Sequence, residues 1–125
     1  MALFGFSKDE RLKNKKSIQA LFDQGERFFE YPFIIVWCTT EDEQSHLKTA
    51  ISVPKKKIPK AVHRNKIKRQ IKEAIRLQQH QLNTKLSHQQ LQLQLILIYS
   101  QTNIMSTVEI KDKISVTLQR LAEQI

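Results

Sequence analysis

The residues best suited to chemistry form one cationic stretch, residues 55–76, with the sequence KKKIPKAVHRNKIKRQIKEAIR. This stretch contains ten lysines and arginines and a single acid, Glu73, so its net charge of +9 equals that of the whole chain. Lysine and arginine side chains donate hydrogen bonds and carry a positive charge, which suits them to bind phosphate groups. The excess charge of the protein is therefore concentrated in one segment that can hold a polyanion.

The apolar residues of this stretch predict a helix that begins near Pro59 and ends near Gln81. Ile67 and three later residues form one stripe at i, i+4, i+7 and i+8, and proline suits the first turn of a helix. The opposite side of the predicted helix is polar and contains Asn65, Lys66, Lys68, Arg69, Lys72 and Arg76. Most charged helix faces are simply solvated, but here no acids alternate with the cations at the spacing of ion pairs. The pattern favours a nucleic acid over a membrane, because the apolar stripe is needed for the core and lacks aromatic anchors.

Three motifs follow one another in and before this helix: residues 51–56 (ISVPKK), residues 61–69 (AVHRNKIKR) and residues 71–74 (IKEA). Together they resemble the signature of the bacterial ribonuclease P protein subunit, in which a strand ending in a Lys-Lys pair precedes an Arg-Asn-Arg motif on a long helix. The resemblance implies a subunit of an RNA-based endonuclease that removes 5′ leaders from precursor tRNAs. It also implies that the RNA subunit and its Mg²⁺ ions perform the hydrolysis, so the protein itself has no cofactor, metal site or catalytic residue.

The resemblance further implies two groups of binding residues. The group expected to bind the RNA subunit is Arg64, Asn65, Lys66, Lys68, Arg69 and Lys72. The group expected to hold the single-stranded leader is Ile18, Phe22, Trp37, Lys55, Lys56 and Lys57. The family has a second arginine where this chain has Lys66, which keeps the charge but loses the bidentate fork.

The leader group departs from the family pattern in its aromatic residues. Relatives have two aromatic positions four residues apart in the first helix, and here these are Ile18 and Phe22. Base stacking is therefore expected at Phe22, whereas apolar contact or core packing is expected at Ile18. Relatives often have a tyrosine near Val36, which leaves Trp37 or Tyr31 as alternative stacking surfaces, although a lone tryptophan in a small domain usually belongs to the core.

The rest of the chain predicts a single α+β domain, because 125 residues suffice for one modest core. A short helix is expected over residues 15–24, followed by Gly25 as its C-terminal cap. Strands are expected over residues 28–39 and 47–53, paired as a hairpin around a solvated acidic turn at residues 41–43, with a further strand over 94–100. Residues 82–88 are expected to form a connection. Ser106 and Glu109 predict a capping box for a last helix, whose packing stripe is Ile110, Ile114, Leu118 and Leu121.

These elements predict a small two-layer sandwich with helices packed on a mostly antiparallel sheet. The resemblance adds a β-α-β crossover around the cationic helix, in the fold named ribosomal protein S5 domain 2-like. It also implies that residues 1–125 are a single RNA-binding domain of the ribonuclease P protein type.

The sequence also bears on other classes of protein. Cys38 is the only cysteine, which excludes an intrachain disulfide and a cysteine-based metal site, and no stretch suits a signal peptide or a membrane span. We therefore expect a cytoplasmic protein that has the RNA subunit and precursor tRNA as partners, with no membrane and no obligate protein partner. One alternative is a structural RNA-binding protein such as a ribosomal component, which would share the cationic helix. A metal-dependent nuclease built on residues 41–43 has little support, since adjacent carboxylates do not converge on one ion.

Overall fold

The computed structural model describes residues 15–41 and 46–125 of the chain. The elements in this part follow one another as α1 (Lys15–Gln24), β1 (Glu26–Glu30), β2 (Phe33–Glu41), β3 (Leu47–Ser52), α2 (Ala61–Gln78), α3 (His80–Gln89), β4 (Leu91–Tyr99) and α4 (Thr107–Gln124). The strands form one sheet in the order β1-β2-β4-β3. The pairs β1/β2 and β2/β4 are antiparallel, whereas β3 and β4 are parallel.

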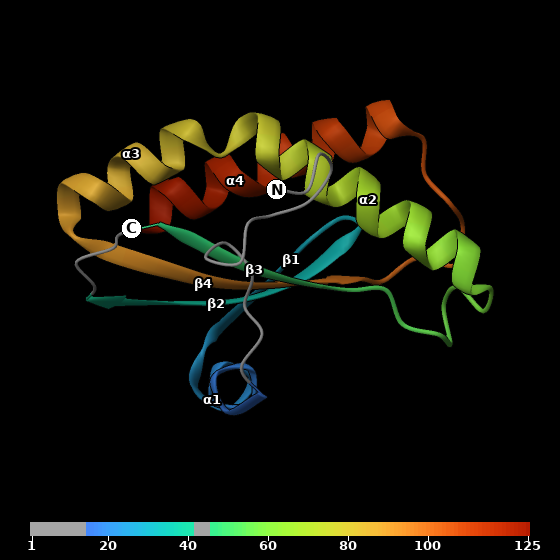
Figure 1. Cartoon of the computed structure of the whole chain (residues 1–125), viewed down its shortest axis with the longest axis horizontal. Helices are drawn as coiled ribbons and strands as arrows, with labels where there is room; N and C mark the ends of the chain where they lie inside the picture. The colour runs from blue at the N-terminus through green and yellow to red at the C-terminus, as the bar shows by residue number, and fades with distance from the viewer. Residues whose placement is uncertain (1–14, 42–45) are drawn as a thin grey trace.

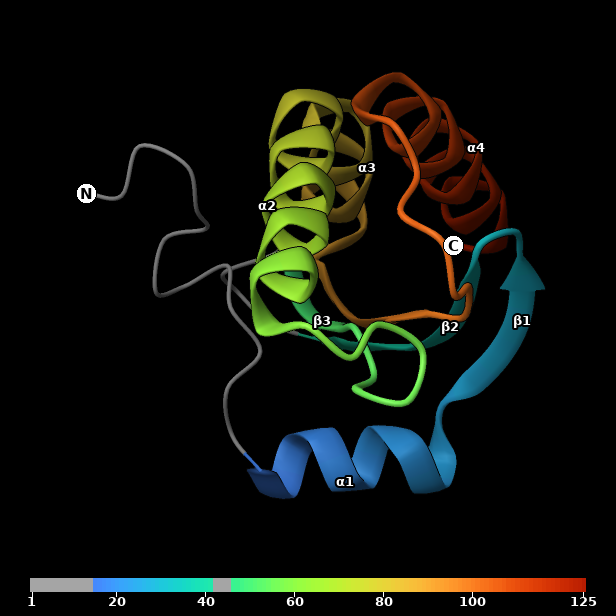
Figure 2. The same ribbon diagram turned by 90° about the vertical axis from the view of Figure 1, so that its right-hand side faces the viewer.

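The chain between the two parallel strands contains α2 and α3, so β3-α2-α3-β4 is the β-α-β crossover that was predicted. Helices α2, α3 and α4 lie together on one face of the sheet (Figure 1). Helix α1 lies alone on the opposite face (Figure 2). The α+β fold with a mostly antiparallel sheet is thus confirmed, and α1 adds a small layer beyond the two that were predicted.

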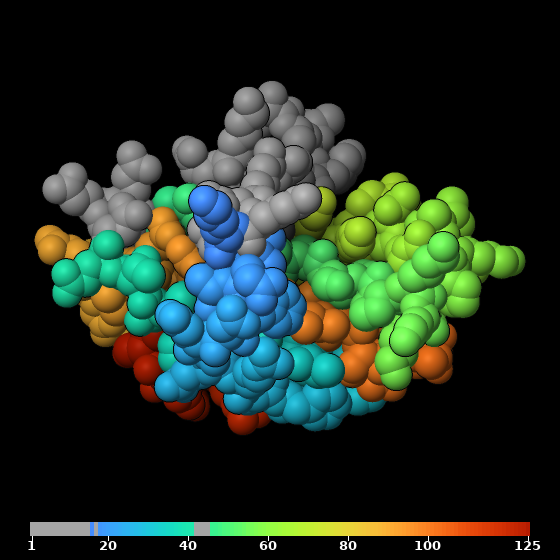
Figure 3. Space-filling model, turned by 90° about the horizontal axis from the view of Figure 1, so that it is seen from below, coloured from blue at the N-terminus to red at the C-terminus, as the bar shows by residue number. Residues whose placement is uncertain are grey.

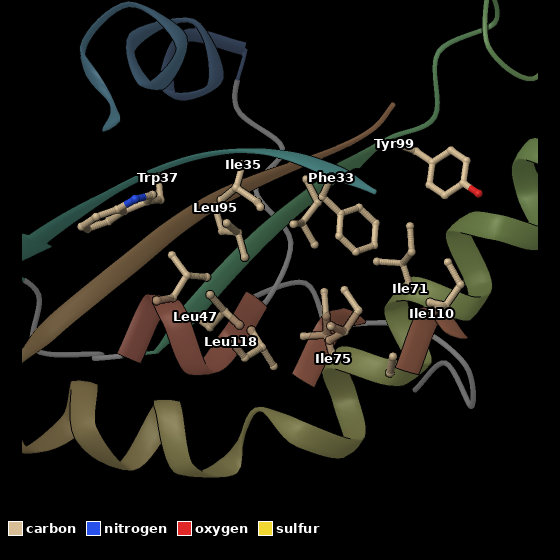
Figure 4. Close-up of a cluster of buried hydrophobic side chains, with 14 of the residues drawn as sticks. Phe33, Ile35, Trp37, Leu47, Ile71, Ile75, Leu95, Tyr99, Ile110 and Leu118 are labelled. Carbon is tan, nitrogen blue, oxygen red and sulfur yellow. The ribbon is translucent and has the colours of Figure 1, made fainter. Parts of the chain in front are cut away.

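The core lies between the sheet and the three helices. Strand β2 directs Phe33, Ile35 and Trp37 into it, and the side chains drawn in Figure 4 from β2 and β4 meet those of α2 and α4. The buried residues of α2 are the predicted stripe Ile67, Ile71, Ala74 and Ile75. The predicted stripe of α4 is also buried, namely Ile110, Ile114, Leu118 and Leu121.

Two local predictions are confirmed at the ends of helices. Helix α1 has the predicted bounds, residues 15–24. The backbone N–H of Glu109 donates to the Ser106 hydroxyl over 3.2 Å, so Ser106 caps α4. Gly25 follows α1 as expected, and its backbone N–H donates to the Leu21 carbonyl over 2.8 Å, although its φ is not positive.

The prediction of one strand over residues 28–39 was wrong. Tyr31 and Pro32 form a turn between β1 and β2, joined by a cis peptide bond. Proline has no N–H to donate to a sheet, so the ladder breaks there. The backbone N–H and the hydroxyl of Ser100 both donate to the Pro32 carbonyl, over 2.9 and 2.7 Å.

The predicted hairpin between residues 28–39 and 47–53 was also wrong. Strand β4 lies between β2 and β3, and β3 pairs with β4 in parallel. The predicted strand over 94–100 is real but begins at Leu91. Alternating apolar residues identify strands without specifying which strands pair. The acidic turn at residues 41–43 cannot be compared, because Glu41 ends β2 while residues 42 and 43 lie outside the described residues.

The expected connection over residues 82–88 is instead part of helix α3. Leu82 and Leu86 are buried four residues apart, and the Asn83 side-chain oxygen accepts a hydrogen bond from the Leu47 backbone N–H over 3.0 Å. The helix ends at Gln89, and the next residue, Gln90, caps it with a left-handed φ of 55°. Only two apolar residues mark α3 in a glutamine-rich segment, which left its helical period too weak to predict.

Candidate nucleic-acid interface

Helix α2 presents its cations on the flank that faces away from α4. The Gln70 side chain donates to the Thr107 hydroxyl over 3.0 Å, and the Gln78 side chain donates to the Lys111 carbonyl over 3.1 Å, so these two residues mark the flank that contacts α4. At about 100° per residue, the opposite direction holds residues that we call the cationic flank. The cationic flank consists of Asn65, Lys68, Arg69, Lys72 and Arg76.

The predicted residues of this helix differ in exposure. Asn65, Lys66 and Arg69 are exposed, while Lys68 and Lys72 are half-buried. Arg76 pairs with Glu73 within the helix, and this hydrogen bond lowers the pKa of the Glu73 carboxyl. The acid of the stretch therefore offsets the charge of Arg76, at the far end of α2 from Asn65 and Lys66.

Arg64 has a different position from the other predicted cations. Its guanidinium donates to the carbonyls of Ile58 and Pro59, over 3.1 and 2.6 Å. The backbone N–H groups of Lys57 and Ile58 both donate to the Pro54 carbonyl over 3.0 Å. Arg64 therefore braces the segment between β3 and α2 as well as adding charge to it.

The braced segment contains the three lysines that were predicted at the strand-to-helix turn. Lys55, Lys56 and Lys57 are all exposed. The turn projects beyond the sheet on the side that carries α1 (Figure 2). These lysines therefore occupy the strand-to-helix turn, as was predicted, and their contact with a leader stays a prediction.

Helix α1 covers only part of its face of the sheet. Leu21 packs on Val36 of β2 and Ile96 of β4, and Ile18 and Phe22 lie half-buried against this small cluster. Gly25 permits the close approach, because a Cβ there would lie 2.5 Å from the Leu21 carbonyl oxygen and 3.1 Å from that of Trp37. Figure 3 shows α1, in blue, standing on this face with atoms of β4 and of the turn before α2 visible beside it.

A row of four residues, one from each strand, remains open next to α1. The register pairs Phe29 with Ile34, Ile34 with Ile98, and Ile98 with Ser52, so all four lie side by side across the sheet. Phe29 is 54% exposed and Ile34 is 37% exposed. We call this row the open strip; it runs from the edge strand β1 to the end of β3, just before the lysine turn.

Trp37 does not belong to this surface. Its side chain is 7% exposed and packs in the main core, on the face of the sheet opposite α1. The expectation that Trp37 is a core residue is confirmed, and its assignment to the leader group is corrected. Tyr31 is also turned away, since its ring lies 5.3 Å from the Lys113 ammonium of α4.

The sequence did not identify the exposed members of the open strip. Ile34 alternates with Phe33 and Ile35, so its face was predictable, but the apolar pattern of β2 gives no sign of which face stays open. Phe29 was missed because its orientation depends on the turn at Pro32 and on the pairing of β1 with β2.

Other titratable groups on this face have no sign of reactivity. Burial raises the pKa of the Cys38 thiol, which keeps it protonated near neutral pH, and its sulfur lies 3.8 Å from the Gln94 side-chain oxygen.

Within residues 15–41 and 46–125, no three His, Cys, Asp or Glu side chains gather where they could hold a metal ion. None of the helices in that part of the chain has the length and hydropathy to cross a bilayer.

Comparisons with known proteins decide what kind of domain this is. The family model for ribonuclease P matches residues 6–122. The chain belongs to the ribonuclease P protein family. The ribonuclease P protein component of Porphyromonas gingivalis is 38% identical over 91 residues, which cover 72% of this chain and 66% of that relative, just under two thirds of its length.

Solved ribonuclease P proteins share the fold. The protein from Staphylococcus aureus superposes with a TM-score of 0.70 and 28% identity, covering 90% of this chain and 94% of that one. The protein from Thermotoga maritima, at 19% identity and a TM-score of 0.67, shows the same fold over 89% of this chain and 96% of its own. Membership in the ribonuclease P protein family does not favour the alternative of a ribosomal component.

Proposed function

We propose that this chain is the protein subunit of a ribonuclease P holoenzyme, where it binds the RNA subunit and holds the 5′ leader of precursor tRNA. The proposal rests on the observation that this member of the family has two separate surfaces suited to bind RNA. One surface is the cationic flank of α2, and the other is the open strip between α1 and the lysine turn. A holoenzyme of this kind would act in the cytoplasm.

The cationic flank supplies charge to the RNA subunit. Lys68, Arg69 and Lys72 lie on this flank with Asn65, and exposed Lys66 lies next to it on the same helix. Each phosphate that a cation neutralises releases counterions, so about four such contacts give a slope of roughly −3 to −4 for log K against log salt. The buried stripe of Ile67, Ile71 and Ile75 fixes the helix on the core, which keeps these cations in a constant arrangement.

The open strip and α1 supply discrimination. Charge alone would hold any RNA, whereas a precursor differs from a mature tRNA only in its leader. Phe22 offers a half-buried aromatic ring on which an unpaired base can stack, while the turn at residues 55–57 offers ammonium groups to the leader phosphates. Ile18 contributes apolar contact without an aromatic ring.

The chemical step belongs to the partner RNA in this proposal. The RNA subunit and its Mg²⁺ ions hydrolyse the phosphodiester bond, and the protein residues orient the leader. Adding the chain to a ribonuclease P RNA at low Mg²⁺ should produce cleavage at the 5′ end of the mature tRNA. A ribosomal component would give no such cleavage, and cleavage by the protein with no RNA present would instead indicate a nuclease of its own.

The assembled holoenzyme should bind precursor tRNA more tightly than mature tRNA. Phe22→Ala should reduce this preference by roughly tenfold, because stacking on one aromatic side chain contributes about 1–3 kcal/mol. Lys72→Ala should weaken RNA-subunit binding and change the preference much less. Equal affinity of the unmodified holoenzyme for precursor and mature tRNA would disprove the leader assignment.

A further inference from the structure

Strand β1 places both of its acids on the core side of the sheet, together with Phe28. Glu26 and Glu30 oppose Trp37 and Phe33, which point into the core, whereas Arg27 and Phe29 oppose Val36 and Ile34 on the face of α1. Arg120 of α4 confirms the first orientation, since it lies 3.7 Å from the Glu30 carboxylate and stacks 4.2 Å above the Phe28 ring. The strand therefore presents only a cation and an aromatic ring to the open side.

Phe29 belongs to neither the main core nor the small hydrophobic cluster under α1. Its side chain is 54% exposed, more than that of Tyr31 at 41%. It continues the open strip to the sheet edge, so the strip spans three strand spacings, or about 14 Å. A surface of this length extends well past Phe22.

The charges around the open strip favour an anion. In the register of the four strands, the residues on the α1 face include Arg27 and Lys48 and contain no aspartate or glutamate. Lys55, Lys56 and Lys57 follow the other end of the strip. An apolar floor with cations at both ends suits an unpaired nucleic acid, whose bases stack while its phosphates bind the cations.

Arg27 connects this edge to the first helix. Its guanidinium donates to the Phe22 carbonyl over 2.6 Å and lies 5.8 Å from the centre of the Phe22 ring. Arg27 thus holds the end of α1 to β1. Phe29 lies two residues further along β1 on the same face as Arg27.

We propose that Phe29 is a second base-stacking residue, which binds a leader nucleotide where the leader crosses the edge strand β1. This inference rests on the proposed function and assigns a residue outside the predicted leader group. Phe29 supplies an aromatic surface in a chain that has isoleucine at position 18 and a buried valine at position 36. Specificity for the precursor then comes from two rings, Phe22 on α1 and Phe29 on β1.

The test compares leader length in the reconstituted holoenzyme. Phe29→Ala should weaken binding of a precursor with a long leader by roughly five- to tenfold, while mature tRNA and a precursor with a minimal leader bind as before. Phe29→Trp should restore the affinity, whereas Phe29→Leu, which keeps an apolar side chain without a ring, should not. Val116→Ala is the matched control, because Val116 is 45% exposed on α4.

A spectroscopic readout distinguishes stacking from a general loss of structure. A fluorescent base analogue placed along the leader should be quenched by the unmodified protein and by Phe29→Trp, and should lose this quenching at one position with Phe29→Ala. Unchanged thermal unfolding of each variant shows that the fold is intact. If Phe29→Ala leaves long-leader affinity and quenching unchanged while Phe22→Ala lowers both, the inference is wrong and the proposed function stands. If the unmodified holoenzyme shows no preference for precursor, both are wrong.

Discussion

The two faces of the sheet carry similar apolar residues, but one face is closed by helices and the other stays partly exposed. On the helix side, Phe33, Ile35 and Trp37 of β2 are 0%, 0% and 7% exposed, whereas on the α1 side the intervening Ile34 is 37% exposed. The side chains on both faces are apolar, so their chemistry does not explain the difference. What differs is the cover, since three helices pack on one face and one short helix packs on the other (Figure 2).

This difference indicates how a small domain can keep an apolar binding surface. Fully burying one large apolar side chain contributes about 1.5–3 kcal/mol to folding, and the helix side contains most of these buried residues. The helix side therefore stabilises the sheet enough that the α1 side can remain partly open. Phe29 and Ile34 then stand on a rigid floor, which limits the ordering that a bound ligand requires.

The largest expected effect comes from a substitution on the closed face. Phe33→Ala should lower the free energy of unfolding by about 3–5 kcal/mol, because Phe33 is fully buried and packs edge-on against Tyr99 with ring centres 6.3 Å apart. Ile34→Ala, one residue along the same strand, should lower it by only about 1 kcal/mol or less. Urea unfolding of the free protein measures both.

In a binding assay the order of these two variants should be reversed, with Ile34→Ala having the larger effect. Ile34→Ala should reduce the preference of the holoenzyme for precursor over mature tRNA, since Ile34 lies in the open strip beside Phe29. If both substitutions lower the free energy of unfolding by similar amounts, the two faces of the sheet do not differ in burial as the exposed fractions of their side chains indicate.

A smaller effect is expected where α1 meets the sheet. Gly25→Ala should destabilise the protein by about 1–3 kcal/mol, because the added Cβ would meet the backbone oxygens of Leu21 and Trp37, which cannot both move aside. The displaced helix should also lose leader preference while RNA-subunit binding through α2 is retained. Gln24→Ala, at an exposed position one residue earlier, is the control for both measurements. An unfolding free energy for Gly25→Ala equal to that of Gln24→Ala would show that α1 is loosely held.

The sequence was sufficient for features that depend on neighbouring residues. The ends of α1, the buried stripe that begins at Ile67 and the Ser106 cap of α4 were all predicted, because periodicity and capping act within a few residues. The motif resemblance also indicated the family before the fold was known. Local pattern and motif order together defined the cationic helix and the turn of lysines before it.

The features that were missed depend on contacts between distant residues. The pairing of β3 with β4 and the orientation of Trp37 follow from how the sheet is assembled, and both faces of β2 are apolar. Phe29 was assigned to no site because the turn at Pro32 was not recognised. Arg64 was expected only to contact RNA, since nothing in the sequence shows that its guanidinium reaches the carbonyls of Ile58 and Pro59.

The smallest predicted effect concerns Arg64, which lies on α2 next to the lysine turn. Arg64→Lys keeps the positive charge but replaces a fork that reaches two carbonyl groups with a single ammonium group. The variant should lose about 1 kcal/mol of stability, because hydrogen bonds from a charged donor are stronger than average but these are partly open to solvent. Arg69→Lys is the matched control on the same helix, where Arg69 is exposed.

The salt dependence of RNA binding tells the bracing role of Arg64 apart from a direct phosphate contact. If Arg64 acts mainly on the turn, Arg64→Gln, which removes the charge, should leave the slope of log K against log salt for RNA-subunit binding unchanged and should lower the affinity for precursor more than that for mature tRNA. Arg69→Gln, which removes a charge from the cationic flank, should instead reduce the slope for RNA-subunit binding by about one and leave the preference between precursor and mature tRNA unchanged. Equal stability of Arg64→Lys and Arg69→Lys would show that the two carbonyl hydrogen bonds do not hold the lysine turn in place.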